Sequence, residues 1–402
     1  MVYGEKFLGL SAALGCITDS RKDPSRIPPP LVARATLVMA LARLGSLNAL
    51  EGTKSLSFWK RWLSGPLPSA DSVGRICSGM DPAMLRSVNA QIYARLKRSK
   101  ALQAPWHGLV PLILDGHESH ATYRRTCQGC LHRETKTAGG TRTQNYHRSV
   151  AALLVTESVP FVLDSEPQLP GEDEITCALR LLDRVLLQYP RAFDVVLGDA
   201  LYTDPRLYNY VLSRGKDAMT VLKDDRRNLI EDARAIFALL SPQTFSRGKT
   251  DVLCWDEEDF RSWPQVSAPV RVVKTQETTR IRRQLDDEIE ILQTEWLWVT
   301  TLPRSRAASQ AAVCLGHTRW DIENKAFNES STYWHADHVY KHDPGAMLVF
   351  ALFCMIACNI FHAFFTRNLK PAVKTKTTML LVARLVLSEL LTELTTGPPR
   401  PP

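Results

Sequence analysis

The stretch "GLVPLILD", residues 108–115, decides the fold class. Its apolar residues follow one another without polar alternation, a pattern typical of a strand buried on both faces of a sheet. The stretch "FDVVLGD", residues 193–199, has the same character and also ends in an aspartate. Buried strands of this kind, separated by helical patterns, indicate an α/β fold.

The segments around these two runs alternate between strand and helix patterns. Acidic residues precede the first helical pattern, which is favourable at a helix start, and Gly215 closes the second. The segments are the strands "RSVAALLVT" (148–156), "PFVLDSEP" (160–167) and "AMTVL" (218–222), and the helices "ITCALRLLDRVLLQY" (175–189) and "PRLYNYVLSRG" (205–215). The sequence therefore predicts a mixed sheet of about five strands.

Residues 241–303 have a different pattern. Three segments alternate in the manner of half-exposed strands: "TDVLCWDEEDF" (250–260), "PVRVVKTQE" (269–277) and "TEWLWVTTL" (294–302). Four tryptophans lie in this region: Trp255, Trp263, Trp296 and Trp298. We predict a β-rich insertion, after which the α/β pattern resumes.

The first hundred residues read as helices, and the last of these helices ends in the basic residues Arg95, Lys97, Arg98 and Lys100. A helix, a turn and a helix with a basic end suit DNA binding. A dimerisation or packing module with a solvated charged end explains the same pattern equally well.

Composition sets broad limits on partners and compartment. The 402 residues include 50 Lys and Arg against 42 Asp and Glu, a net charge of +8 that suits a polyanionic partner without requiring one. Nine scattered cysteines favour a reducing compartment. The N-terminal apolar run lacks a clear small-residue cleavage site, so we expect no secretion signal and a cytoplasmic location.

The run "AMLVFALFCMIACNIFHAFF", residues 346–365, has no charged residue and is long enough to span a bilayer. Asn359 and His362 interrupt it, and it is the only such run in the chain. A buried helix packed against a sheet is the preferred interpretation, and a membrane anchor is the alternative.

The stretch "RWDIENKAFNE", residues 319–329, carries an acidic residue in an unexpected place. Wound at about 100° per residue, it puts Glu323 near the middle of an apolar arc. An unpaired charge there costs several kcal/mol. Either Arg319 neutralises it within the helix, or the helix packs beside the sheet and Glu323 meets Asp115 and Asp199 around bound cations.

Three converging carboxylates without nearby thiols favour a hard divalent ion, Mg²⁺ or Mn²⁺. Two such ions can activate a water or a 3′-hydroxyl and stabilise the leaving oxygen at a phosphodiester. The predicted metal ligands and catalytic residues are therefore Asp115, Asp199 and Glu323.

The blocks "LILDGHE", "VVLGDALY" and "RWDIENKAFNE" together resemble those of bacterial insertion-sequence transposases of the DDE class. The similar members have a ribonuclease-H-like domain with a β-rich insertion before the catalytic Glu. The resemblance implies the same fold, DNA cleavage and strand transfer, and a match of Arg319 to the signature arginine. Two positions depart from the signature: Gly316 replaces its tyrosine and Ser330 its lysine.

On this resemblance the chain has five segments. They are a helical N-terminal domain (1–104), the first part of the catalytic domain (105–240), the β-rich insertion (241–303), the catalytic Glu helix with a core helix (304–370), and a C-terminal helix with a proline-rich tail (371–402). Expected partners are double-stranded DNA of element ends and target, bound by a homodimer or higher oligomer, with no membrane contact.

Candidate DNA contacts are Arg124, Arg125, Arg319 and Lys325, and the resemblance implies that Trp296 or Trp298 stacks on a flipped base. Cys127 and Cys130 have knuckle spacing, and the nearby His117, His120, His132 and His147 could complete a zinc site, but one such cysteine pair is weak evidence for zinc. The pair therefore reads as a reduced tight loop, and His335, His338 and His342 as structural or DNA-facing. Alternative functions are an inactive DNA-binding relative, a membrane-anchored protein and a stand-alone nuclease.

Overall fold

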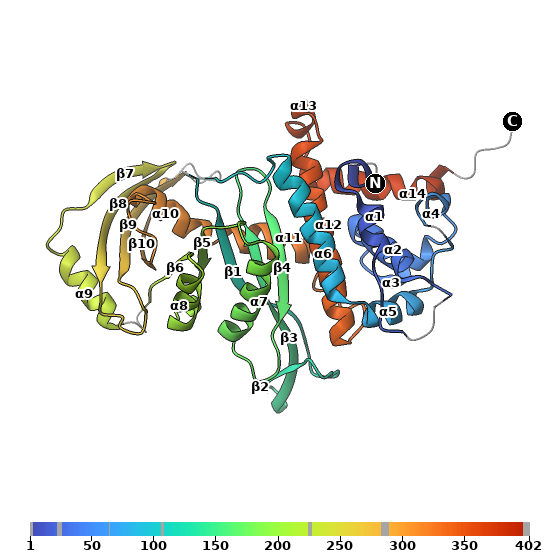
Figure 1. Ribbon diagram of the computed structural model, residues 1–402, viewed down its shortest axis with the longest axis horizontal. Coiled ribbons are helices and arrows are strands. Elements are labelled where there is room, and N and C mark those ends of the chain that lie inside the picture. Colours follow the sequence, from blue (N-terminus) through green and yellow to red (C-terminus); the bar gives the residue numbers. More distant parts are fainter. Residues whose placement is uncertain are drawn as a thin grey trace. The chain divides into compact units, whose positions relative to one another are not determined.

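The computed structural model describes residues 3–21, 26–63, 65–105, 108–223, 227–282 and 289–396, so the proline-rich end at 397–402 lies outside the described residues. The chain forms two compact units. The first unit comprises Met1–Gln103, Gly116–Tyr189 and Glu323–Pro402, and the second comprises Ala104–Asp115 and Pro190–Ile322. Both mix helices with strands (Figure 1), which confirms the predicted α/β class.

The described strands belong to a ten-stranded mixed sheet. Its order is β2-β3-β1-β5-β6-β10-β9-β8-β7, with β4 paired to β3. The strands are β1 (Pro111–Thr122), β2 (Leu131–Thr137), β3 (Gly140–Leu154), β4 (Phe161–Pro167), β5 (Val195–Gly198), β6 (Asp217–Val221), β7 (Gln243–Arg247), β8 (Thr250–Phe260), β9 (Val270–Arg282) and β10 (Ile289–Thr300). Strand β1 runs through both units, because the chain passes from the second to the first at Gly116.

In the second unit, the two apolar runs form buried strands as predicted, and these strands are parallel. Strand β1 pairs with β5, and β5 pairs with β6, in parallel. Leu112, Ile113 and Leu114 are fully buried. The helical elements of this unit are η2 (Ala200–Tyr202), α8 (Pro205–Ser213), α9 (Arg227–Phe237) and α10 (Ser309–Thr318).

The segment predicted to be β-rich forms strands β7–β10, which extend this sheet in antiparallel pairs. Strand β10 pairs with β6, and β9, β8 and β7 follow outward in antiparallel pairs. The Tyr208 hydroxyl of α8 donates to the Val299 carbonyl at 2.8 Å, which ties the helix to β10. The insertion therefore continues the hydrogen-bonded sheet.

Helices dominate the first unit. They are η1 (Gly4–Leu8), α1 (Leu10–Gly15), α2 (Pro29–Leu41), α3 (Leu47–Gly52), α4 (Ser57–Trp62), α5 (Ala70–Gly79), α6 (Pro82–Arg98), α7 (Glu174–Gln188), η4 (Glu323–Phe327), α11 (Asn328–Trp334), α12 (Pro344–Arg367), α13 (Pro371–Lys374) and α14 (Met379–Thr396). Sequence-encoded caps begin several of them, such as Ser69 for α5 and Asp173 for α7.

Helix α12 lies in the core of the first unit, where it contacts α2, α5, α6 and β4 (Figure 1). Among the described helices it alone has the length and apolar composition to cross a membrane. Its most apolar 18-residue stretch has a mean hydropathy of 2.2, and 72% of that stretch is buried inside the protein. The amide of Asn359 donates to Asn89 at 2.9 Å and to the Val162 carbonyl at 2.8 Å. The polar residue that interrupts the apolar run is thus satisfied inside the protein, and the predicted burial against a sheet is confirmed.

Two local predictions were wrong. Strand β1 does not end at Asp115 but continues to Thr122. Strands β2 and β3 form a hairpin, whereas the sequence predicted only one strand here, beginning at residue 148. The cause is polar composition: β2 buries only Leu131, so it has no apolar alternation to detect.

The second error concerns the stretch at 319–329. Helix α10 ends at Thr318, and residues Glu323–Phe327 form a π-helix, whose i→i+5 pattern advances by a smaller angle per residue. Trp320 lies in the turn before the π-helix and is 40% exposed, while Ile322 and Ala326 are buried. Glu323 is partly exposed and not at the centre of a buried arc.

Candidate active site

Asp115 lies on β1, and Asp199 directly follows the neighbouring parallel strand β5 in the second unit. The β1–β5 register aligns Leu112 with Val196 and Ile113 with Leu197, and the same register continued by two residues would set Asp115 level with Asp199. Asp199 caps η2, where its carboxylate accepts from the Leu201 amide at 2.9 Å. Two of the three predicted ligands thus belong to adjacent segments of the sheet.

Arg319 contacts the first of these aspartates. Its guanidinium Nη1 lies 3.7 Å from Asp115 Oδ2, and its side chain is 8% exposed. The guanidinium also lies 4.0 Å from the centre of the Trp320 ring, a cation–π contact. Arg319 is therefore held beside a predicted metal ligand and not on the open surface, where a purely DNA-facing side chain would lie.

Glu323 opens the π-helix η4 in the first unit, with Lys325 exposed two residues later. π-Helical turns occur often at functional sites, where they re-aim side chains. Ser330, in place of the signature lysine, donates its hydroxyl to the Phe327 carbonyl at 3.0 Å. The meeting of Glu323 with Asp115 and Asp199 stays a prediction.

Two of the other predicted DNA contacts, Arg124 and Arg125, lie between β1 and β2. Both side chains are exposed, as a phosphate contact requires. The Asn145 amide donates to the Arg125 carbonyl at 3.0 Å, which fixes the backbone of this segment to β3.

Trp296 and Trp298 lie on the same face of β10, with ring centres 5.9 Å apart and planes inclined by 9°. Trp298 is 1% exposed and Trp296 partly exposed. Of the two rings, Trp296 is thus the one that a base can reach without displacement of other residues. A stacking role for Trp298 stays a prediction and requires α10 to move.

Gly316 of α10 has a steric reason to be glycine. A Cβ atom added to this residue would lie 2.5 Å from Cε2 of Trp298. A tyrosine at this position, as in the transposase signature, would overlap the buried indole ring. The indole of Trp298 therefore explains why this chain has glycine, and not the signature tyrosine, at residue 316.

The two tryptophans adjoin a close contact between His317 and the buried Glu277. His317 Nε2 lies 2.6 Å from Glu277 Oε1, and its ring packs edge-on against Trp298 at 5.2 Å. Burial alone raises the pKa of Glu277, but the contacts with His317, Thr275 and Arg247 outweigh it and hold the pKa below its ordinary value of 4.5.

This depressed pKa predicts an acid-dependent contribution to stability. Because Glu277 is more acidic in the folded state, the contribution is complete above its unfolded pKa and is lost as pH falls through the folded pKa. Glu277→Gln is expected to lower the thermal midpoint at pH 7, and to do so less and less as pH falls below about 4. Scanning calorimetry of both proteins across pH 3–7 measures this; a constant difference would contradict it.

One group of side chains was considered as a zinc site from the sequence but not preferred, and one of its members was missed. Cys127, Cys130, His147 and His342, all in the first unit, present ligand atoms within 4.8 Å of one another. The knuckle spacing of the cysteines was a weak signal, and His342 was assigned no metal role. It follows Cys130 by 212 residues, so no local spacing could connect them.

Comparison with known proteins adds no identification. No family model matches the chain, and no curated protein matches it.

Proposed function

We propose that the protein is a DDE-type DNA transposase that cuts at the ends of its own insertion sequence and joins the freed 3′-hydroxyl to target DNA. The observation that carries the proposal is the parallel pairing of β1 with β5, whose register, continued two residues, would set Asp115 level with Asp199. Asp199 lies at the carboxyl end of β5, where open α/β sheets gather functional groups, and Asp115 lies within β1, which continues to Thr122. The resemblance of the three sequence blocks supplies the reaction class.

The order of elements supports a ribonuclease-H-like catalytic domain. Strands β1–β4 precede α7, β5, α8 and β6, so the order differs from the predicted three strands, helix, strand, helix and strand by the additional strand β2. The insertion of β7–β10 lies between Asp199 and Glu323, as it does in the transposases that the sequence resembles.

The donor set fits a hard divalent cation. Asp115 and Asp199 offer carboxylate oxygens, the Asp115 side chain is 16% exposed, and Glu323 is the proposed third ligand. When bound, Mg²⁺ or Mn²⁺ supplies charge neutralisation and activation of the attacking oxygen. Arg319 positions Asp115 through their contact and balances part of its charge when no cation is present.

The chain's remaining proposed roles concern DNA. In cleavage, a water oxygen forms a bond to phosphorus while the bond to the 3′-oxygen breaks, which leaves a 3′-hydroxyl and a 5′-phosphate. In joining, that hydroxyl attacks a target phosphodiester, and one P–O bond forms as another breaks. Exposed Arg124, Arg125 and Lys325 are available for phosphate contacts, and the N-terminal helices for element ends, in a homodimer or higher oligomer.

The test uses a supercoiled plasmid that carries the chain's own gene with its flanking DNA. We expect cleavage at the element ends and joining to a second plasmid with Mg²⁺ or Mn²⁺, and neither with EDTA. Asp115→Asn, Asp199→Asn and Glu323→Gln are each expected to lower cleavage at least about 100-fold while binding is retained. Asparagine still caps η2, so Asp199→Asn removes the charge and not the turn.

Asp204→Asn is the matched control, because Asp204 also caps a helix, α8, near a strand end but is not a proposed ligand. It should cleave like the unmodified protein. DNA binding without cleavage under any of these metals would overturn the proposal and favour the inactive DNA-binding relative. Cleavage without joining would favour a stand-alone nuclease.

A further inference from the structure

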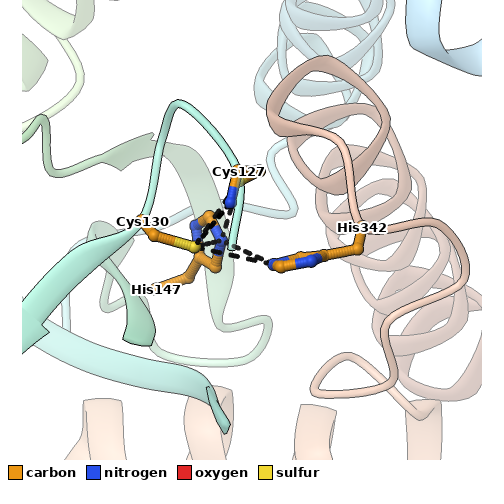
Figure 2. A group of neighbouring side chains, drawn as sticks. All are labelled: Cys127, Cys130, His147 and His342. Atoms are coloured by element: carbon orange, nitrogen blue, oxygen red, sulfur yellow. Dashed lines mark hydrogen bonds between the residues drawn. The ribbon is translucent and has the colours of Figure 1, made fainter. Parts of the chain in front are cut away.

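Four side chains of the first unit converge from three separate parts of the chain. Cys127 and Cys130 lie between β1 and β2, His147 lies on β3, and His342 lies just before α12. Figure 2 shows Cys130, His147 and His342 pointing toward one another, with Cys127 beside them. Their ligand atoms all lie within 4.8 Å of one another.

Five of the six distances between these atoms fit the edges of a zinc tetrahedron, and the sixth, from Cys127 Sγ to the ligand nitrogen of His342, is within 4.8 Å. Zn–S bonds of about 2.3 Å and Zn–N bonds of about 2.0–2.1 Å at tetrahedral angles imply about 3.8 Å between sulfurs, 3.6 Å from sulfur to nitrogen and 3.3 Å between nitrogens. The Cys127 and Cys130 sulfurs lie 3.7 Å apart, and the two Nε2 atoms 3.4 Å apart. His147 Nε2 lies 3.4 Å and 3.3 Å from the two sulfurs, and His342 Nε2 lies 3.7 Å from that of Cys130.

A disulfide does not explain the cluster. A sulfur separation of 3.7 Å is far above the bonded length of about 2.05 Å, and both cysteines are free. The backbone instead forms a tight turn in which the Cys127 amide donates to Cys130 Sγ at 3.2 Å, and the Cys130 amide donates to the Cys127 carbonyl at 3.1 Å. The turn holds both sulfurs on the same side.

Packing around the turn brings His342 within reach of the sulfurs. A Cβ atom on Gly129 would lie 3.1 Å from the Pro344 ring and 3.6 Å from Cε1 of His147. The "CQGC" turn therefore lies directly against the first residues of α12, only two residues from His342. Glycine permits this approach, and Cys130 is 1% exposed beneath it.

We propose that Cys127, Cys130, His147 and His342 bind one structural Zn²⁺. Two thiolates and two imidazoles are a ligand set typical of zinc, and the thiolates balance its charge. Four protein ligands leave no open position, so the ion stabilises the fold and takes no part in bond cleavage. The site is independent of the proposed hard-ion site, whose ligands are carboxylates.

The ion would join the β1–β2 connection and β3 to the start of α12. These segments are far apart in sequence, so a metal bridge between them closes a long loop of the unfolded chain. It would also fix the segment that carries Arg124 and Arg125, just before Cys127. Removal of the ion should therefore loosen this connection first.

The test measures bound metal in the purified full-length protein by mass spectrometry, after reconstitution with Zn²⁺ and removal of free ion. We expect about one zinc per chain, falling to background in the double variant Cys127→Ser/Cys130→Ser. Cys16→Ser, an exposed free cysteine, and His120→Ala, whose ring lies 5.9 Å from that of His342, are controls that should keep the ion. Equal zinc in the double variant and the unmodified protein would overturn the proposal.

A second measurement works even if the double variant fails to fold. Co²⁺ in place of Zn²⁺ should give the intense visible absorption of a tetrahedral site, with thiolate charge-transfer bands in the near ultraviolet. His342→Cys should keep binding and shift these bands, because it exchanges a nitrogen for a third sulfur. A weak octahedral spectrum, or no change in His342→Cys, would rule out the four proposed ligands.

Discussion

Asp164→Ala is expected to lower the free energy of unfolding by about 3–5 kcal/mol, because it removes a fully buried carboxylate that pairs with the buried Arg86 and the partly buried Arg184. Asp164 of β4 has a fully buried side chain. Its two oxygens accept from Arg86 Nε of α6 at 3.0 Å and Arg184 Nε of α7 at 2.5 Å. The carboxylate thus joins one strand to two helices of the first unit.

Glu166 extends this network but cannot replace Asp164. It contacts Arg86, Arg180 and Arg184, so its own charge is already shared among three guanidinium groups. Burial is the largest influence on Arg86 and lowers its pKa, whereas the attraction of the Asp164 carboxylate raises this pKa. Removal of Asp164 leaves the burial cost of the arginines with less to offset it.

Urea unfolding followed by circular dichroism measures this loss. Asp164→Asn, which keeps one acceptor, should lose less than Asp164→Ala. Glu118→Ala is the matched control, because Glu118 pairs with Arg133 at 2.7 Å on the exposed surface, where such a pair contributes about 0–1 kcal/mol. If Asp164→Ala and Glu118→Ala unfolded at the same urea concentration, the buried network would contribute no more to stability than the exposed ion pair.

The fold could be predicted where buried segments have a recognisable apolar pattern in the sequence. The unbroken apolar runs of β1 and β5 predicted buried strands, and the alternating segments of the insertion predicted β8, β9 and β10. The β2–β3 hairpin left no such mark, because its residues are largely exposed on both faces. The π-helix at Glu323–Phe327 was equally invisible, since the helical period assumed 100° per residue.

The residues of the candidate sites also differ in how far the sequence alone could place them. Asp115 and Asp199 follow apolar runs, so their place at the ends of the buried segments could be read directly. His342 could not be joined to Cys127 and Cys130, because only the packing of α12 against the turn brings them together. From the sequence, Gly316 was only a departure from the signature, whereas its structural reason is the close approach of Trp298 on β10.

Trp298→Ala is expected to cost about 3–5 kcal/mol, because it removes a large, fully buried side chain from the core of the second unit. The neighbouring Gly316 makes a sharper test of the same packing. Glycine to alanine within a helix is normally stabilising by about 0.5–1 kcal/mol. Here the new Cβ atom would lie 2.5 Å from the rigid indole, so we expect Gly316→Ala to destabilise by about 1–3 kcal/mol.

The sign of the Gly316→Ala effect should therefore depend on residue 298. In the Trp298→Ala background the clash is absent, and Gly316→Ala should become neutral or stabilising, which a double-mutant cycle measures as a coupling of the two sites. Gly52→Ala in α3 is the matched control, because nothing lies within 4 Å of its added Cβ atom. Additive effects at 298 and 316 would show that the indole does not exclude a side chain at 316. In that case the missing signature tyrosine would need a cause other than the packing of Trp298.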